Sequence, residues 1–184
     1  MKQVYYTHAT VNTWLHNIMR EMARDNWKPD YVVGLTRGGL VPAVMLSHYL
    51  SVPMNTLKVS LRDDGDTESN LWMAEDALGH MTEEEQILAA AMCCPKERTK
   101  ILIVDDINDT GSTLQWIKDD WQSSCMPNNP DWGSVWGNNV RVAVMVNNEA
   151  SAFTADYAGI NINKNEEPQW SVFPWEEWWD SRIN

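Results

Sequence analysis

The chain has 184 residues, a hydrophobic fraction of 43% and a formal net charge of −12, which together predict one domain with a proper core. A surface this acidic repels nucleic-acid phosphates and anionic lipids, so we expect neither as a partner. The sequence contains no run of about 18 apolar residues, so we expect no membrane span. We also expect no signal peptide, because the first residues lack an apolar segment. Three cysteines without metal-ligand spacing favour a reducing, cytoplasmic setting.

Apolar residues in the first half of the chain predict alternating helices and strands. Val11, Trp14, Leu15 and Ile18 recur at the three- and four-residue spacing of an amphipathic helix. Short apolar runs indicate strands, and a strand–helix–strand order favours a parallel sheet. The polar residues 62–70 predict a mobile loop. We predict helices over residues 10–26, 40–50 and 71–92, and strands over residues 31–35 and 54–61.

Residues 101–114 carry the most informative pattern in the chain. They begin with Ile-Leu-Ile-Val, which is typical of a strand buried on both faces. Two adjacent carboxylates follow, Asp105 and Asp106, and then a small, hydroxyl-rich segment at residues 109–113 that leads into a helix predicted over residues 113–123. Such a loop points backbone N–H groups at one spot, where the helix dipole favours negative charge. We therefore expect an anion site, with phosphate as the anion.

This order of apolar strand, two acids, two spacers and Asp-Thr-Gly-x-Thr resembles the phosphoribosyl-diphosphate (PRPP) signature of the type I phosphoribosyltransferases. The resemblance implies that Asp105 and Asp106 bind the ribose hydroxyls, directly or through Mg²⁺. It implies that Asp109, also part of the PRPP site, lies near N7 of a purine as the catalytic acid or base. For both Asp105 and Asp106 to act on one ligand, the chain must leave the strand there, because adjacent strand residues face opposite sides. The 5′-phosphate would be held by Thr110, Gly111, Ser112 and Thr113.

A second glycine-containing loop follows the strand predicted over residues 31–35. Arg37, Gly38 and Gly39 let the backbone approach a bulky anion while the guanidinium adds a fork of donors. In the family that the chain resembles, such a loop holds the pyrophosphate of PRPP and can contain a cis peptide. We expect that peptide at Arg37–Gly38 or at the bond before it. The two loops would then lie at the carboxyl ends of neighbouring strands, where α/β proteins bind ligands.

The C-terminal part of the chain bears on the acceptor base. Strands are predicted over residues 140–146 and 157–162, and residues 170–176 resemble the closing segment of xanthine- and hypoxanthine/guanine-type enzymes. That resemblance implies that Trp170 stacks on a purine, with the backbone of Ser171 bonding its edge. Family members that use 6-oxopurines carry a lysine where this chain has Asn147. An uncharged amide both donates and accepts and would polarise a 6-oxo group less, so a 6-aminopurine, a modified purine and a weaker activity all stay open beside a 6-oxopurine.

We therefore expect a single type I phosphoribosyltransferase domain over residues 1–184. Its fold would be α/β, with a central, mostly parallel sheet flanked by helices and a small hood built from the chain ends, including residues 147–184. The resemblance implies transfer of a phosphoribosyl group from PRPP to a purine, with Mg²⁺ as cofactor, in a homo-oligomer of two or four subunits.

Three alternatives stay open. The first is a non-catalytic or regulatory relative that binds PRPP or a nucleotide, against which an intact Asp109 argues. The second is another phosphate enzyme, although the P-loop and dinucleotide glycine patterns are absent from the sequence. The third is a phosphoribosyltransferase for a pyrimidine or another non-purine acceptor.

Overall fold

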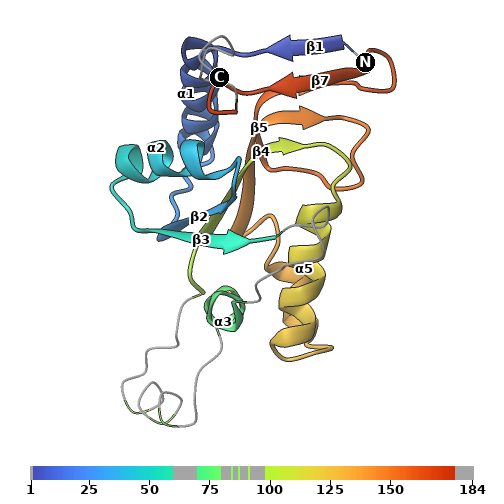
Figure 1. The fold of residues 1–184 in the computed structure, drawn as a ribbon. Coiled ribbons are helices and arrows are strands. Elements are labelled where there is room, and N and C mark those ends of the chain that lie inside the picture. The colour runs from blue at the N-terminus through green and yellow to red at the C-terminus, as the bar shows by residue number, and fades with distance from the viewer. Residues whose placement is uncertain are drawn as a thin grey trace, which may run out of the picture.

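A computed structural model describes residues 2–59, 70–79, 84, 87, 91 and 98–176. Its centre is a five-stranded, fully parallel sheet with the strand order β3-β2-β4-β5-β6 (Figure 1). This arrangement confirms the predicted α/β class and the parallel sheet. The strands are β2 (Tyr31–Thr36), β3 (Met54–Lys58), β4 (Ile101–Asn108), β5 (Val140–Asn148) and β6 (Tyr157–Ile162).

Helices cover both faces of the sheet, and each face has its own core. One core joins the sheet to α3 and α5, and the other joins it to α1 and α2. In β4, Ile101 and Ile103 belong to the first core, whereas Leu102 and Val104 belong to the second. All four side chains are fully buried, as a central strand with two covered faces requires. The helices are α1 (His8–Arg24), α2 (Leu40–Leu50), α3 (Leu71–Leu78) and α5 (Ser112–Ser124), with a short 3₁₀ helix at Pro130–Ser134.

Several predicted boundaries shift for local reasons. Helix α1 begins at His8 because the Thr7 side chain caps it, accepting from Thr10 N at 3.1 Å. Helix α3 ends at Leu78 because Gly79 takes a left-handed conformation with φ of 73°, so the prediction of one continuous helix over residues 71–92 is wrong. Most of residues 80–97, like the predicted mobile loop at residues 62–69, lie outside the described residues.

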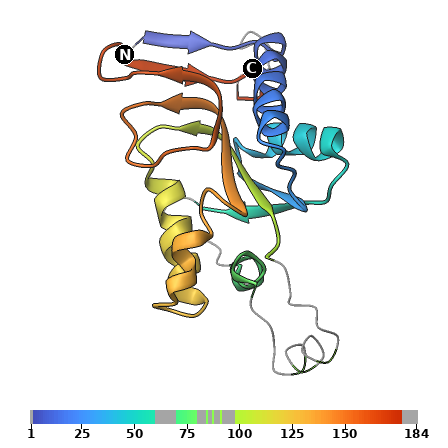
Figure 2. The same cartoon turned by 180° about the vertical axis from the view of Figure 1, so that it is seen from behind.

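A second, two-stranded parallel sheet joins segments from opposite ends of the sequence. It consists of β1 (Lys2–Tyr5) and β7 (Gln169–Val172), paired from Lys2↔Gln169 to Tyr5↔Val172. We call this pair, with the turn that follows at residues 173–176, the hood. Both views place it at one end of the molecule, next to β4 and β5 (Figures 1 and 2). A hood built from the two chain ends is therefore present, although neither of its strands is predicted from sequence. The expected range of residues 147–184 is too wide, because β5 extends to Asn148 and β6 belongs to the central sheet.

Among the described residues, none of the helices combines the length and the apolar character needed to cross a bilayer.

Candidate functional site

Two helices begin at neighbouring points on one edge of the sheet. Strands β2 and β4 are paired directly, and their carboxyl ends lead into α2 and α5 (Figure 1). Both helices have a glycine at the N-cap, no side-chain cap and no acidic residue in the first turn. Not every N–H group of the first turns is open to an anion, because Leu40 N donates to Arg37 O at 3.2 Å, Pro42 has no N–H, and Ser112 N donates to Thr110 Oγ1 at 3.4 Å. The backbone N–H of Val41 in α2 and those of Thr113 and Leu114 in α5 are the donors that remain, and the helix dipole favours an anion there. The geometry thus provides two adjacent anion sites, one at each predicted loop.

The loop at Arg37–Gly39 lies directly against β4. A cis peptide bond joins Thr36 and Arg37, which is the second of the two positions indicated by the sequence. A Cβ on Gly38 would overlap the carboxylate of Asp106, and one on Gly39 would overlap the carbonyl oxygen of Val104. Only glycines allow this close approach, while the Arg37 side chain is exposed.

The carboxylate pair lies inside a strand, so the expectation that the chain leaves the strand at Asp105 and Asp106 is wrong. Strand β4 continues to Asn108 because its pairing with β5 continues, with Asp105 opposite Val144 and Asn108 opposite Asn147. The Asp106 carboxylate contacts Gly38. Asp105 instead turns along the chain, where its Oδ1 accepts from Asp106 N at 2.9 Å.

The two carboxyls are electrostatically strained. Burial, with the neighbouring Asp106 charge, raises the pKa of Asp105 well above its usual value. Burial also raises the pKa of Asp106 to about 6, and Glu176 in the hood adds to this shift. A cation or hydroxyl donors from a ligand would relieve this charge. No group of three or more metal-binding side chains occurs in the part of the chain that the structure describes. Because Asp105 and Asp106 are adjacent within a strand, their side chains leave it on opposite faces, and Asp106 is the one whose carboxylate lies against the Gly38 loop.

The loop at residues 109–113 is supported by the segment after β5. Gly111 has φ of 85°, and a Cβ there would lie 2.6 Å from Phe153 N and 2.7 Å from Ser151 Oγ. The carbonyl of Thr110 accepts from Ala152 N at 3.1 Å. Within the loop, the hydroxyls of Thr110 and Ser112 are 2.9 Å apart. The segment at residues 151–153 therefore fixes the backbone that leads into α5.

An asparagine ladder connects the ends of three neighbouring strands. Asn108 Nδ2 donates to Asn147 Oδ1 at 2.8 Å, and Asn147 Nδ2 donates to Asn161 Oδ1 at 3.0 Å. The three residues are in register across β4, β5 and β6. The amide of Asn147, a predicted base-binding group, is thus engaged on both sides. Sequence reasoning missed Asn108 and Asn161, although asparagine at the end of three successive strands is a visible signal.

Asp109 has a cationic neighbour that sequence reasoning also missed. Lys164, in the turn after β6, places Nζ 2.9 Å from Asp109 Oδ1. Buried Asn148 connects the same two residues through their backbones, donating to Asp109 O at 2.9 Å and accepting from Lys164 N at 3.1 Å. No pattern in the sequence joins Lys164 to the loop, because the contact depends on how β5 and β6 pair.

Trp170 and Ser171 lie on β7 in the hood. The Trp170 side chain is 46% exposed, and it takes part in none of the ring contacts found among the described residues. By contrast, Phe173 and Trp175 stack with ring centroids 5.0 Å apart. Ser171 is buried, with its hydroxyl 3.5 Å from that of Tyr6. Trp170 is therefore separate from the aromatic cluster of the hood and free to contact a ligand.

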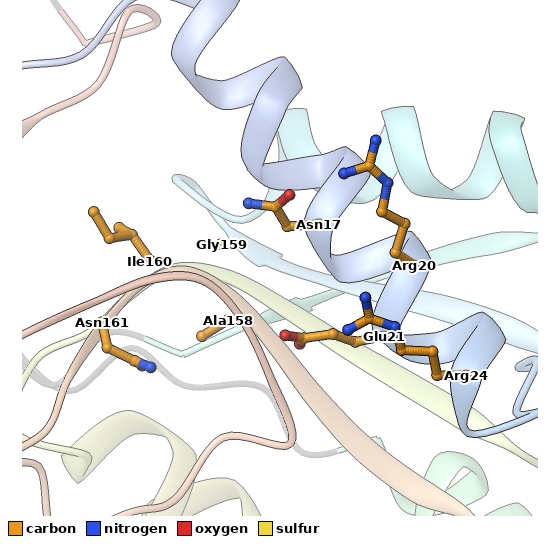
Figure 3. A pocket seen from close by; sticks show the side chains of 8 residues that line it. All are labelled: Asn17, Arg20, Glu21, Arg24, Ala158, Gly159, Ile160 and Asn161. Carbon is orange, nitrogen blue, oxygen red and sulfur yellow. The ribbon is translucent and has the colours of Figure 1, made fainter.

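A groove of about 330 Å³ lies elsewhere, between α1 and β6 (Figure 3). It shares Asn161 with the asparagine ladder but none of the residues of the two anion-binding loops. We place the site at the loops because the uncapped helix ends and the strained carboxyls converge there. The groove is lined by Asn17, Arg20, Glu21 and Arg24 of α1 and by Ala158, Gly159, Ile160 and Asn161 of β6.

The family model and the curated relatives that match this chain are all described as phosphoribosyltransferases. The family model described as phosphoribosyl transferase domain matches residues 2–182. The xanthine-guanine phosphoribosyltransferase of Idiomarina loihiensis is 28% identical over 109 residues, which are 57% of this chain and 58% of that protein. Xanthine phosphoribosyltransferase 1 of Saccharomyces cerevisiae is 21% identical over 125 residues, 62% of this chain and 58% of that protein. The chain thus spans less than two thirds of the length of these relatives.

Solved structures with the same fold include two purine enzymes. A purine phosphoribosyltransferase from Pyrococcus horikoshii Ot3 has a TM-score of 0.62 and 23% identity, with 96% of each chain covered. The xanthine-guanine-hypoxanthine phosphoribosyltransferase of Helicobacter pylori has a TM-score of 0.63 and 19% identity, covering 95% of this chain and 93% of that one. At these identities the similarity establishes a shared fold.

Proposed function

Because the chain belongs to the phosphoribosyl transferase domain family, we propose that it transfers the phosphoribosyl group of PRPP to a purine, giving a nucleoside 5′-monophosphate and pyrophosphate. One observation carries this proposal. Two uncapped helix N-termini, those of α2 and α5, flank the carboxylates of Asp105 and Asp106 at the ends of adjacent strands. PRPP has two phosphate-bearing ends joined by a ribose with free hydroxyls, and the order of anion site, carboxylates and anion site supports its binding here.

In this proposal each loop binds one phosphate-bearing end of PRPP. Arg37, Gly38 and Gly39 hold the pyrophosphate through backbone N–H groups and the guanidinium. The loop from Thr110 to Thr113 holds the 5′-phosphate. The hydroxyls of the ribose lie between them, where the raised pKa values of Asp105 and Asp106 favour a ligand that donates hydrogen bonds.

The reaction itself requires little covalent work from the protein. The bond from C1′ to pyrophosphate breaks, a bond from C1′ to N9 of the base forms, and the base gives up its N7 proton to Asp109. Because positive charge develops on the ribose as pyrophosphate leaves, the chain's main tasks are to orient the partners and to stabilise the departing anion. Trp170 supplies a stacking face for the base, a contact that contributes about 1–3 kcal/mol in nucleic-acid complexes.

Magnesium is the cofactor that fits this site. Mg²⁺ binds through one or two carboxylates, keeps several waters and takes further oxygens from a phosphate substrate, which suits Asp106 beside the Gly38 loop, with Asp105 acting through a bound water. When bound there, it would neutralise charge on the departing pyrophosphate. We also propose, from the family resemblance, that the protein acts as a homo-oligomer in the cytoplasm.

The test measures pyrophosphate release from PRPP against a panel of purines and pyrimidines. We expect release with at least one purine, and an Asp109→Asn variant slower by about 10²–10⁴-fold, the usual contribution of general acid–base catalysis. Asp119→Asn, at an exposed position on α5, is the control. Equal rates for wild type and Asp109→Asn would refute the catalytic role. PRPP binding without turnover of any base would indicate the non-catalytic alternative, and turnover of pyrimidines alone would indicate a non-purine acceptor.

A further inference from the structure

Strand β6 forms one edge of the central sheet, and in the part of the chain that the structure describes no strand pairs with its outer side. Asp156 N donates to Val142 O, and Glu149 N donates to Ile162 O, so the even-numbered residues along this edge direct their backbone groups toward β5. Because these groups alternate in direction along a strand, those of Gly159 and Asn161 point away from β5. They present a short row of N–H and C=O groups to another extended chain.

This open edge forms one wall of the groove of about 330 Å³ described above, and α1 forms the other (Figure 3). The wall on α1 carries three charged residues, Arg20, Glu21 and Arg24. Within the described part of the chain, the side chains of these three residues take part in no ion pair and no hydrogen bond. Two arginines and one glutamate leave the lining of the groove positive, although the chain as a whole has a net charge of −12.

We propose that the groove binds an extended acidic segment of a partner protein, which adds a strand to the free edge of β6. The backbone of the segment exchanges hydrogen bonds with Gly159 and Asn161, and its carboxylates pair with Arg20 and Arg24. The spacing of the groups agrees with this arrangement. Residues four apart on a helix are separated by about 6 Å along its axis, and residues two apart on a strand by about 6.6 Å. A segment with an acid at every second position therefore carries its carboxylates at nearly the spacing of the two arginines.

The chemistry of the groove favours a peptide over a small anion. Gly159 and Asn161 each present a backbone acceptor as well as a donor, and a phosphate or carboxylate ion satisfies only the donors. A peptide backbone offers both kinds of group in the same alternation. Glu21 stands between the two arginines in the sequence, where it repels a compact anion but accepts a hydrogen bond from a hydroxyl or amide side chain of a peptide.

The packing of α1 on β6 favours a peptide over a second copy of this chain. A Cβ on Gly159 would lie 2.4 Å from Trp14 Cβ, so α1 lies directly against this strand. Two copies joined edge to edge through β6 by a two-fold axis would have these strands about 4.8 Å apart, with both α1 helices on the same face of the joined sheet. Packed helices need about 8–10 Å between their axes, so the two helices would collide. A single extended segment brings no helix with it.

The experiment titrates the full chain with a fluorescently labelled peptide in which Glu alternates with Thr, and follows the anisotropy of the label. We expect saturable binding that Arg20→Gln and Arg24→Gln each weaken about tenfold, because each change removes a hydrogen bond between charged groups. Lys100→Gln, which removes an exposed cation outside the groove, is the matched control and should leave the affinity unchanged. A peptide with Gln in place of every Glu should bind at least tenfold more weakly.

A second peptide tests the pairing with β6 separately from the charges. Methylation of every backbone nitrogen retains the carboxylates but removes the N–H groups, so we expect this peptide to lose binding. Equal affinity of the methylated and unmethylated peptides would overturn the proposal, as would unchanged affinity in both arginine variants. An absence of saturable binding at about 1 mM peptide would do the same.

Sedimentation of the wild type and the two arginine variants examines the remaining occupant. The wild type should show no self-association that depends on Arg20 or Arg24, and an oligomer that either variant abolishes would assign the groove to a second copy and overturn the proposal. None of these measurements involves pyrophosphate release, so they test the groove independently of the proposed function.

Discussion

Gly38 and Asp106 are in direct contact, so that the loop after β2 lies on the carboxylate of the neighbouring strand. The contact joins the proposed pyrophosphate and ribose sites into one surface. It also explains why the loop needs a residue without a side chain at this position, since any Cβ would overlap the carboxylate.

Gly38→Ala tests that contact. The added methyl group must displace Asp106 or the loop, and overpacking of this kind costs about 1–3 kcal/mol. We expect a fall in kcat/KM for PRPP of at least tenfold, together with a lower Tm. Gly133→Ala is the control, because a Cβ at Gly133 meets nothing within 4 Å. Unchanged PRPP kinetics in Gly38→Ala would mean that this contact is not part of the site.

The raised pKa of Asp106 predicts how stability depends on pH. The Asp106 carboxyl has a pKa of about 6 in the folded protein, whereas its usual value is 3.8. Because the native state binds more protons than the unfolded chain in this range, the free energy of unfolding should fall as the pH rises from about 4 to about 6. In Asp106→Asn this contribution disappears, and we expect a gain of about 3 kcal/mol at neutral pH, since each unit of raised pKa corresponds to about 1.36 kcal/mol.

Denaturant titrations over that pH range would measure the effect. Glu149→Gln, at an exposed position, should retain the wild-type pH profile. Glu176→Gln should shift the profile to lower pH, since Glu176 adds to the raised pKa. A profile in Asp106→Asn identical to that of the wild type would contradict the prediction.

Replacing the two end residues of the asparagine ladder, Asn108 and Asn161, should lower the stability of the protein by unequal amounts. Asn108 is 1% exposed and donates to both Asn147 Oδ1 and Phe153 O, so Asn108→Ala leaves two partly buried acceptors without this partner. We expect a loss of about 1–3 kcal/mol of stability. Asn161→Ala, at the exposed end of the ladder, should cost much less. Thermal unfolding of the two variants side by side measures the difference, and equal costs would show that the ladder is not a buried structural element.

Replacing Trp170 should affect binding of the base, whereas replacing Trp175 should affect the stability of the protein. Trp170→Ala removes an exposed ring without ring contacts, so we expect the KM for the base to rise about tenfold through lost stacking, with little change in Tm. Trp175→Ala removes the ring that stacks on Phe173 and should destabilise the protein by about 3 kcal/mol. A KM for the base that does not change in Trp170→Ala would exclude this ring from the site.

The sequence predicts those parts of the molecule in which local pattern and tertiary context agree. The run from Ile101 to Val104 is apolar on both faces, so its central place in the sheet follows from periodicity alone. The end of β4 does not follow, because pairing with β5 extends the strand through polar residues. Strands β1 and β7 have four residues each, which is too short for their residue pattern to indicate a strand, so their mutual pairing defines them.

The site shows the same division. Residues that act through the backbone of a tight loop, such as Gly38 and Gly111, are recognisable because few residue types can replace them. Lys164 is not recognisable, because its contact with Asp109 requires the pairing of β5 with β6 and the turn closed by Asn163. A side chain that reaches a site from a distant turn leaves no spacing in the sequence.

The pairing of β1 with β7 has a consequence for the order of assembly. Chains emerge from the ribosome at about 5–20 residues per second, and Lys2–Tyr5 is made long before its partner Gln169–Val172. Every strand of the central sheet precedes β7 in the sequence, so the two loops proposed to bind PRPP can form on a nascent chain while β1 has no partner. The surface that carries Trp170 is then the last to form, so the proposed contact with the base would be completed after the proposed phosphate-binding loops.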